Sequence, residues 1–171
     1  MKSFEPITEQ DLRELVKLAL IEHEDFFKRK PDYELFYKNS LLFILLGQGA
    51  ALHYRYGEYG VKDFDIYLFY KDNPEKKMWV RRVKKVDSNL EKFGNPKIDF
   101  MKKVVKLKYI DNENAVENII FKLLKESKSF VKYLTVFALK EKDRKRNVVI
   151  GLYPESIFKK ILWDGEVQEF V

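Results

Sequence analysis

The first apolar pattern along the chain has helical spacing. Apolar side chains recur every three or four residues over Leu12–Phe27, which predicts an amphipathic helix. Thr8, followed three residues later by Asp11, is a variant of the capping box and marks the helix start. His23 falls on the apolar face, so we expect it to be a packed, hydrogen-bonded histidine. Pro31 ends the pattern.

A continuous apolar run and a glycine-containing turn come next. Leu41–Leu46 is unbroken, which is typical of a strand buried on both faces, and it is closed by Gly47–Gly49. A short helix is expected over Ala50–Tyr56. The β-rich segment Phe64–Tyr70 predicts a second strand, and Lys71–Pro74 has the composition of a turn.

The strongest helical stripe in the chain covers Glu75–Phe93, with Gly94 as a stop signal. We interpret the opposite, basic face of this helix as solvated, with a track for nucleic acid as the alternative. Its cations are Arg81, Arg82, Lys84 and Lys85. Two strands are then expected, over Lys97–Met101 and Val104–Ile110.

The C-terminal third is predicted to be mainly helical. One helix is capped by Asn112 or Asn114 and runs to about Lys125, and another covers Lys128–Lys140. The shorter elements that follow are a strand over Val148–Leu152, a helix opened by Pro154 and a last strand over Val167–Val171. The order of elements predicts an α+β (α/β) fold: a mixed sheet flanked by helices, in a single domain over 1–171. Residues 112–171 could form a small helical cap on it.

Composition narrows the classes of function. With 171 residues, 46% of them apolar, the chain can build one well-packed core. No apolar run approaches the roughly 20 residues that span a bilayer, so we expect no membrane partner. The N-terminus lacks the basic-then-apolar layout of a secretory signal, and we expect a cytoplasmic protein.

The residues available for metal binding and catalysis are also restricted. The chain has no cysteine, which excludes disulfides, thiolate catalysis and Cys-based zinc sites, and its two histidines do not favour a His-rich site. Any metal should therefore be a hard cation held by carboxylates. The net charge of +6 is compatible with a nucleotide or nucleic acid partner, although Lys/Glu-rich surfaces are also common without one.

Two aspartates mark the start of the second predicted strand. Asp63 and Asp65 are two residues apart, so both side chains should project from the same face. Adjacent carboxylates repel unless a cation lies between them, which makes Mg²⁺ a reasonable ligand. Asp99, within the next predicted strand, can reach the same pocket if the two strands are neighbours. It would then complete the metal site and act as a base toward an attacking hydroxyl.

The glycine turn can supply a phosphate site next to these acids. A buried strand, a turn with Gly47 and Gly49, and a helix N-terminus together present free backbone N–H groups. Because the two glycines lack side chains, a triphosphate can approach the backbone closely. A cation held by the acids could then bridge the triphosphate oxygens.

Taken together, the segment Leu41–Met101 resembles the DNA polymerase β-type nucleotidyltransferase superfamily. The likeness lies in the order of glycine turn, helix, acid-x-acid strand, long helix and further acid on the next strand. It is nearest to the minimal nucleotidyltransferases and the abortive-infection toxin type. The resemblance implies that Asp63, Asp65 and Asp99 bind Mg²⁺ or Mn²⁺, and that Gly47–Gly49 hold an NTP. It also implies a nucleotidyltransferase-type sheet.

The sequence departs from this family at three positions. Gln48 and Gly49 stand where the family usually has a turn hydroxyl, and Lys62 stands where a small hydroxyl residue often precedes the first acid. Lys62 could bind phosphate, or pair with Asp63 in a site that takes no metal. Two functions therefore stay open. The first is nucleotidyl transfer to a hydroxyl of RNA, protein or a small molecule, and the second is a catalytically inactive module that binds nucleotide, nucleic acid or a protein partner.

Three other polar features are expected to have structural or solvent-exposed roles. His53 and Arg55 follow the glycine turn, but as single residues they are expected to serve the fold rather than the nucleotide. The basic run Lys140–Arg146 is expected to be a solvated loop, with contact to an RNA backbone as the alternative.

Overall fold

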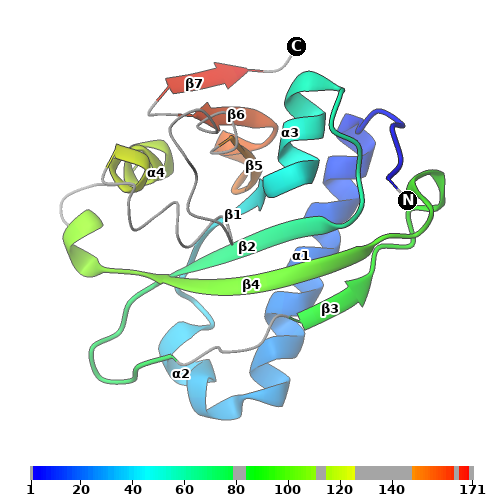
Figure 1. Cartoon of the computed structure of the whole chain (residues 1–171). Coiled ribbons are helices and arrows are strands. Elements are labelled where there is room, and N and C mark those ends of the chain that lie inside the picture. The colour runs from blue at the N-terminus through cyan, green and yellow to red at the C-terminus, as the bar shows by residue number, and fades with distance from the viewer. Residues whose placement is uncertain (1, 79–83, 111–114, 126–147, 164–165, 170–171) are drawn as a thin grey trace.

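A computed structural model describes residues 2–78, 84–110, 115–125, 148–163 and 166–169. They form an α+β fold, as predicted, built on a seven-stranded mixed sheet (Figure 1). The strands are β1 (Leu41–Gly47), β2 (Phe64–Lys71), β3 (Lys84–Asp87), β4 (Lys97–Val105), β5 (Val149–Tyr153), β6 (Lys160–Trp163) and β7 (Glu166–Glu169). The α-helices are α1 (Glu9–Arg29), α2 (Glu34–Tyr37), α3 (Gln48–Tyr56) and α4 (Val116–Lys125). Single 3₁₀ turns lie at η1 (Pro31–Tyr33), η2 (Glu91–Phe93), η3 (Leu107–Tyr109) and η5 (Glu155–Ile157).

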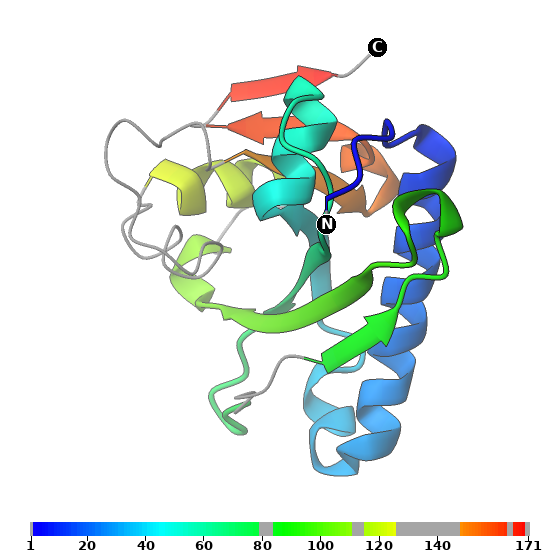
Figure 2. The same ribbon diagram turned by 45° about the vertical axis from the view of Figure 1, so that its right-hand side comes forward.

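The strands are arranged in the order β3-β4-β2-β1-β5-β6-β7. β1 is antiparallel to β2, and β2 is parallel to β4, so the chain crosses over between β2 and β4. β3 lies within that crossover and pairs antiparallel with β4 at the outer edge of the sheet (Figure 2). β5, β6 and β7 extend the same sheet on the other side of β1.

The two faces of the sheet are covered by different helices. Successive residues of a strand point to opposite faces, so Ile66 and Leu68 join the apolar cluster that contains the inner face of α1. Tyr67 and Phe69 point the other way and pack in a second cluster with Ile119 of α4. Burying both faces explains why the central strands are almost continuously apolar.

The N-terminal helix forms where its pattern predicted. Thr8 Oγ1 accepts a hydrogen bond from the Asp11 N–H at 3.2 Å, and Asp11 Oδ2 accepts one from the Thr8 N–H at 2.8 Å. This reciprocal pair is a capping box and satisfies amide groups that have no partner within the helix. The predicted helix start is confirmed.

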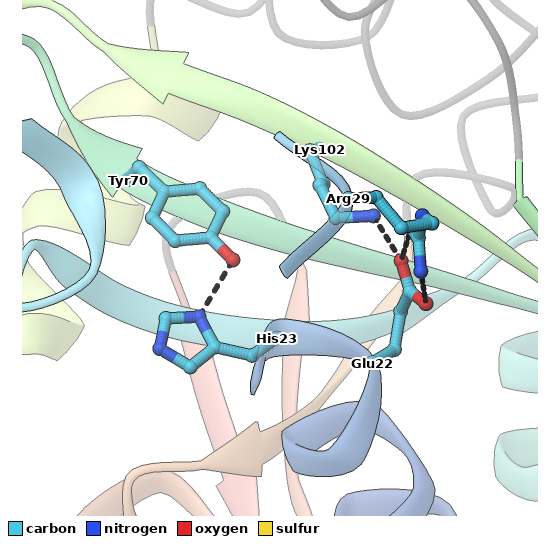
Figure 3. Close-up of polar contacts among 5 residues, drawn as sticks. All are labelled: Glu22, His23, Arg29, Tyr70 and Lys102. Atoms are coloured by element: carbon cyan, nitrogen blue, oxygen red, sulfur yellow. Dashed lines mark hydrogen bonds and ion pairs between the residues drawn. The ribbon is translucent and has the colours of Figure 1, made fainter. Parts of the chain in front are cut away.

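Polar side chains on α1 tie the helix to the sheet (Figure 3). Glu22 accepts two hydrogen bonds from Arg29, at 3.0 and 2.7 Å, and one from Lys102 of β4 at 2.5 Å. Burial alone would raise the pKa of Glu22, but the hydrogen bonds from Arg29 and Lys102 outweigh it and lower that pKa. His23 Nδ1 lies 2.8 Å from the Tyr70 hydroxyl of β2, and burial lowers its pKa. The prediction of a packed, hydrogen-bonded histidine is confirmed.

The helix predicted over Glu75–Phe93 is wrong. Residues 84–87 form β3 and residues 91–93 form the 3₁₀ turn η2, while residues 79–83, with Arg81 and Arg82, lie outside the described part. Asn89 has φ +56°, a left-handed conformation that interrupts a helix. Two apolar residues of the predicted stripe face the core without a helix, because Val86 pairs with Ile98 across the sheet and Phe93 packs edge-on against Phe64.

The prediction of a separate strand over Val104–Ile110 is also wrong. β4 continues without a break from Lys97 to Val105, and η3 follows it. Nothing between Met101 and Val104 signals a turn, and the parallel partner β2 provides hydrogen bonds along this length, ending at the pair Lys71 and Val105. The acid at position 99 therefore lies in a long, well-supported strand.

The expectation of a mainly helical C-terminal part is not supported. Past position 114 the described residues contain α4, the turn η5 and the three strands β5, β6 and β7. Pro154 precedes only the 3₁₀ turn, because the chain returns at once to pair β6 with β5. The strand over Val148–Leu152 is confirmed, and β7 covers part of the predicted last strand. The proposed caps Asn112 and Asn114, the helix over 128–140 and the basic run 140–146 lie outside the described residues.

Among the described helices, none combines the length and the apolar character that crossing a bilayer requires.

Candidate metal centre

One residue from each of four neighbouring strands lies in a single row across the sheet. Gly47 of β1 pairs with Asp65 of β2, Asp65 pairs with Asp99 of β4, and Asp99 pairs with Lys85 of β3. Side chains of directly paired residues project from the same face. The row therefore brings two acids and a lysine together where β1 ends and α3 begins.

A third carboxylate completes the group. Asp63 immediately precedes β2, and one carboxylate oxygen each of Asp63, Asp65 and Asp99 lie within 4.8 Å of one another. Asp65 is buried, with 9% of its surface exposed, whereas the other two are half-buried. The structure thus brings together the three acids that the sequence singled out. It does so because β2 and β4 are direct neighbours.

Asp65 carries the electrostatic cost of this arrangement. Burial, followed by the negative charges of Asp63 and Asp99, raises the pKa of Asp65 to about 7, and the positive charge of Lys85 opposes the rise. Within the described ranges, no N–H or ammonium group donates a hydrogen bond to the Asp65 carboxylate, and Asp63 can share a proton with it. A buried carboxylate in this state is poorly solvated and would gain from a cation.

Lys85 is a functional candidate that the sequence pattern does not reveal. Its Nζ lies 2.8 Å from Asp99 Oδ1, and this hydrogen bond raises the pKa of Lys85. The side chain of Lys85 is 65% exposed, while that of Asp99 is only 14% exposed. The helical pattern expected for residues 75–93 would put Lys85 on a solvated face. Only the pairing of β3 with β4 reveals it as the neighbour of Asp99.

The glycine turn leads directly into α3. Gly47 is the N-cap of this nine-residue helix, and no side chain caps its first N–H groups. A Cβ placed on Gly49 would meet no atom within 4 Å, so the space beside this residue is open. Because Gly47 is paired with Asp65, the start of α3 lies next to the acids.

Gln48 has a role that its sequence position did not suggest. Its backbone is left-handed, with φ +54°, and its Nε2 donates a hydrogen bond to the Tyr67 hydroxyl at 2.6 Å. Tyr67 is two residues beyond Asp65 on the same face of β2. Burial raises the pKa of Tyr67, the hydrogen bond from Gln48 opposes the rise, and the charges of Asp65 and Asp99 add to it. The phenol is therefore neutral and stands in the field of the acids.

The remaining candidates lie apart from this chemistry. Lys62 is exposed, and in the part of the chain that the structure covers no ion pair joins it to Asp63. His53 is buried, its Nδ1 accepts a hydrogen bond from the Gly60 N–H at 2.9 Å, and its Nε2 lies 2.9 Å from the Glu5 carbonyl oxygen. Both ring nitrogens of His53 thus hold the fold together. Arg55 lies over the ring of Tyr56.

The donor set determines which cation would fit. Three carboxylates offer only oxygen ligands, which suits Mg²⁺ or Mn²⁺ and does not favour thiolate- or imidazole-bound metals. The buried Asp65 carboxylate, which receives no hydrogen bond from an N–H group in the described residues, fits the same cation. Asp63, Asp65 and Asp99 are therefore a chemically consistent set of ligands.

Comparisons of the chain with protein-family models, with curated proteins and with solved structures returned no match.

Proposed function

We propose that the chain is a nucleotidyltransferase that depends on Mg²⁺ or Mn²⁺ and transfers a nucleotidyl group from an NTP to a hydroxyl. The observation that carries the proposal is the row Gly47, Asp65 and Asp99, with Asp63 beside it, at the start of α3. It combines a place for a divalent cation with a place for a phosphate chain. The acceptor hydroxyl would belong to RNA, a protein or a small molecule.

Asp63, Asp65 and Asp99 would hold the cation. When bound, a divalent ion supplies Lewis acidity to phosphoryl oxygens and stabilises a leaving pyrophosphate. The buried position of Asp65 would make it the most firmly oriented of the three ligands. Asp63 and Asp99 are less buried than Asp65, and a substrate would have to displace the Lys85 ammonium to reach Asp99.

The start of α3 would hold the phosphate chain. Its N–H groups have no side-chain cap, and no acid lies in its first turn, so an anion there meets partial positive charge. The open space at Gly49 allows a phosphate to approach the backbone. The Tyr67 hydroxyl, held by Gln48, is a neutral polar group on the same face and offsets the absence of a hydroxyl in the turn.

The transfer itself is a displacement at phosphorus. The acceptor oxygen forms a bond to the α-phosphorus, the bond from that phosphorus to the bridging oxygen of the β-phosphate breaks, and pyrophosphate leaves. In this proposal the proton of the acceptor hydroxyl passes to Asp99, the acid of the group that lies on β4 next to Lys85.

A catalytically inactive descendant is the second candidate. Two observations favour it: Lys85 already neutralises Asp99, and Gln48 replaces the usual turn hydroxyl. Such a protein would bind nucleotide, nucleic acid or a protein partner on the same scaffold. Its nucleotide-binding form differs from the enzyme in one measurable respect, because it would bind an NTP without releasing pyrophosphate.

Thermal unfolding with and without MgATP tests the binding part of the proposal. A ligand that binds only the folded state raises the midpoint, by an amount set by its concentration relative to Kd. We expect a metal-dependent rise in the wild type that is absent in Asp63→Ala/Asp65→Ala. Asp32→Asn, at an exposed acid before α2, serves as the matched control and should keep the rise.

Label transfer then separates enzyme from binding module. The protein is incubated with each α-labelled NTP, Mg²⁺ and RNA, protein or small-molecule acceptors. Labelled acceptor and pyrophosphate that appear with the wild type, but not with Asp63→Ala/Asp65→Ala, support the enzyme. Metal-dependent stabilisation without pyrophosphate release from any NTP supports an inactive nucleotide-binding module, and the absence of any stabilisation contradicts both the enzyme and that module.

A further inference from the structure

Lys85 pairs with a carboxylate that a divalent cation would also bind, so the two cations would compete for Asp99. Its ammonium is 2.8 Å from Asp99 Oδ1, and it also interacts with the charges of Asp63 and Asp65. Among the described residues it is the cation that pairs with this cluster. Its strand, β3, is one of the two edge strands of the described sheet, so the side chain reaches the acids from that edge.

The clustering of three acids is not the only observation that points to a ligand site. Asp65 is nine-tenths buried, its carboxylate is directed into the cluster, and no N–H or ammonium group in the described residues donates a hydrogen bond to it. Lys85 pairs with Asp99 and leaves Asp65 without such a donor. The ammonium therefore hydrogen-bonds to Asp99 only and acts on Asp65 from a distance, so among the described residues Asp65 has no cation in direct contact.

The contact between Lys85 and Asp99 can be broken at low cost. The lysine side chain is 65% exposed, and ion pairs of this kind contribute little to stability because water replaces them well. A divalent ion bonded to Asp99 would repel an ammonium at hydrogen-bonding distance from the same carboxylate. The flexible stem of Lys85 allows the ammonium to turn away while β3 stays paired.

We propose that Lys85 is an exchangeable counter-ion of this site. It pairs with Asp99 when no divalent ion is bound, and it turns to the phosphate groups of the metal-bound substrate when one is. This role rests on the proposed function, which supplies both the metal and the anionic substrate. Lys85 would thus bind the phosphate chain from the β3 side, opposite the start of α3.

The adjacent residue provides a matched control. Lys84 is also exposed and lies on the same strand, but it pairs with Phe100, whose side chain faces the opposite side of the sheet. Changing Lys84→Met removes the same charge from the same strand without touching the row. Lys85→Met and Lys85→Gln remove the ammonium from the row itself.

Two binding measurements with opposite expected signs test the role. Mn²⁺ alone is titrated and followed by its electron paramagnetic resonance signal, and pyrophosphate is titrated by calorimetry at saturating Mn²⁺. Without Lys85 the metal no longer competes with an ammonium, so we expect Mn²⁺ to bind about fivefold more tightly. Loss of a charged hydrogen bond should weaken pyrophosphate binding about tenfold. Lys84→Met should match the wild type in both titrations.

The outcomes distinguish this inference from the proposed function. If the wild type binds no Mn²⁺, the metal site itself is wrong. If the wild type binds Mn²⁺ but both Lys85 variants bind Mn²⁺ and pyrophosphate as the wild type does, only the role of Lys85 is overturned. Weaker Mn²⁺ binding in both variants would also overturn it, because Lys85 would then support the metal rather than compete with it.

Discussion

Asp65 is a charged group placed where the folded protein solvates it poorly. Its pKa is raised to about 7 by burial and by the two neighbouring carboxylates. Because the folded-state pKa exceeds that of the unfolded chain, folding favours the protonated form of this group. The contribution of Asp65 protonation to the free energy of unfolding is complete below about pH 4 and is lost as the pH rises through about 7. A bound cation would remove that loss.

Asp65→Asn should therefore stabilise the protein in the absence of metal. The amide has the shape of the carboxyl group and no charge, so at pH 8 we expect a gain of up to about 4 kcal/mol in the free energy of unfolding. At pH 4 the variant and the wild type should be nearly equal. Urea denaturation at both pH values, with a chelator present, measures the difference.

The exposed acid Asp32 provides the control for this comparison. Asp32→Asn should change the free energy of unfolding by less than about 0.5 kcal/mol at either pH. A destabilised Asp65→Asn at pH 8 would mean that the carboxylate makes a favourable interaction in the metal-free protein, contrary to our description.

Among single residues, the sequence identified the three acids but not all of their partners. Alternation along β2 predicted that Asp63 and Asp65 share a face, whereas the convergence of Asp99 was predicted only if its strand lay beside β2. Lys85 and Tyr67 could not be predicted, because their places depend on strand register and on the left-handed backbone of Gln48. Such features depend on tertiary pairing rather than on local pattern.

At the scale of elements, the β1–α3 connection is open where a ligand is expected. Gly49 lies in the first turn of α3 and has free space beside it. Gly49→Ala should leave the free energy of unfolding unchanged or raise it by up to about 1 kcal/mol, because alanine favours helix. The added methyl group would narrow the space for a phosphate and weaken MgATP binding. Urea denaturation and calorimetry give the two values, and MgATP binding that stays as tight as in the wild type would contradict a phosphate site at this turn.

The contact between α1 and β4 makes a different prediction. Glu22 and Lys102 are almost fully buried, and Arg29 also holds Glu22 with two hydrogen bonds. Glu22→Gln leaves the Lys102 ammonium buried without a counter-charge and should cost about 3–5 kcal/mol. Lys102→Met should cost less, because Glu22 keeps Arg29. Urea denaturation of both variants measures which of the two loses more stability.

The double variant Glu22→Gln/Lys102→Met is the decisive control for this pair. Removing both partners leaves no unpaired buried ammonium, so the double variant should be more stable than Glu22→Gln alone. Additive losses in the double variant would show that the two side chains do not depend on each other.

Elements with one strong local signal were predictable. α1 has a capping box and an uninterrupted stripe, and β1 and β2 are apolar runs closed by turns. The segment 75–93 was misread because strand β3 and turn η2 bury apolar residues at nearly helical spacing. Pairing with β4 decided its conformation, and a single sequence does not display that pairing.

At the scale of the whole molecule, the sheet is the scaffold of the site. The row joins residues 47, 65, 85 and 99 on four adjacent strands, and both sheet faces are packed by helices. Ligand atoms on packed strands are held more firmly than ligand atoms on loops. The fold class followed from the sequence, but the order of strands that aligns the row did not.

Anomalous diffraction from crystals grown with Mn²⁺ would show whether the three carboxylates hold a divalent cation. We predict one strong peak within coordination distance of carboxylate oxygens of Asp63, Asp65 and Asp99, with the Lys85 ammonium moved away from Asp99. A map without a peak at these acids at saturating Mn²⁺, with Lys85 still bonded to Asp99, would contradict the account.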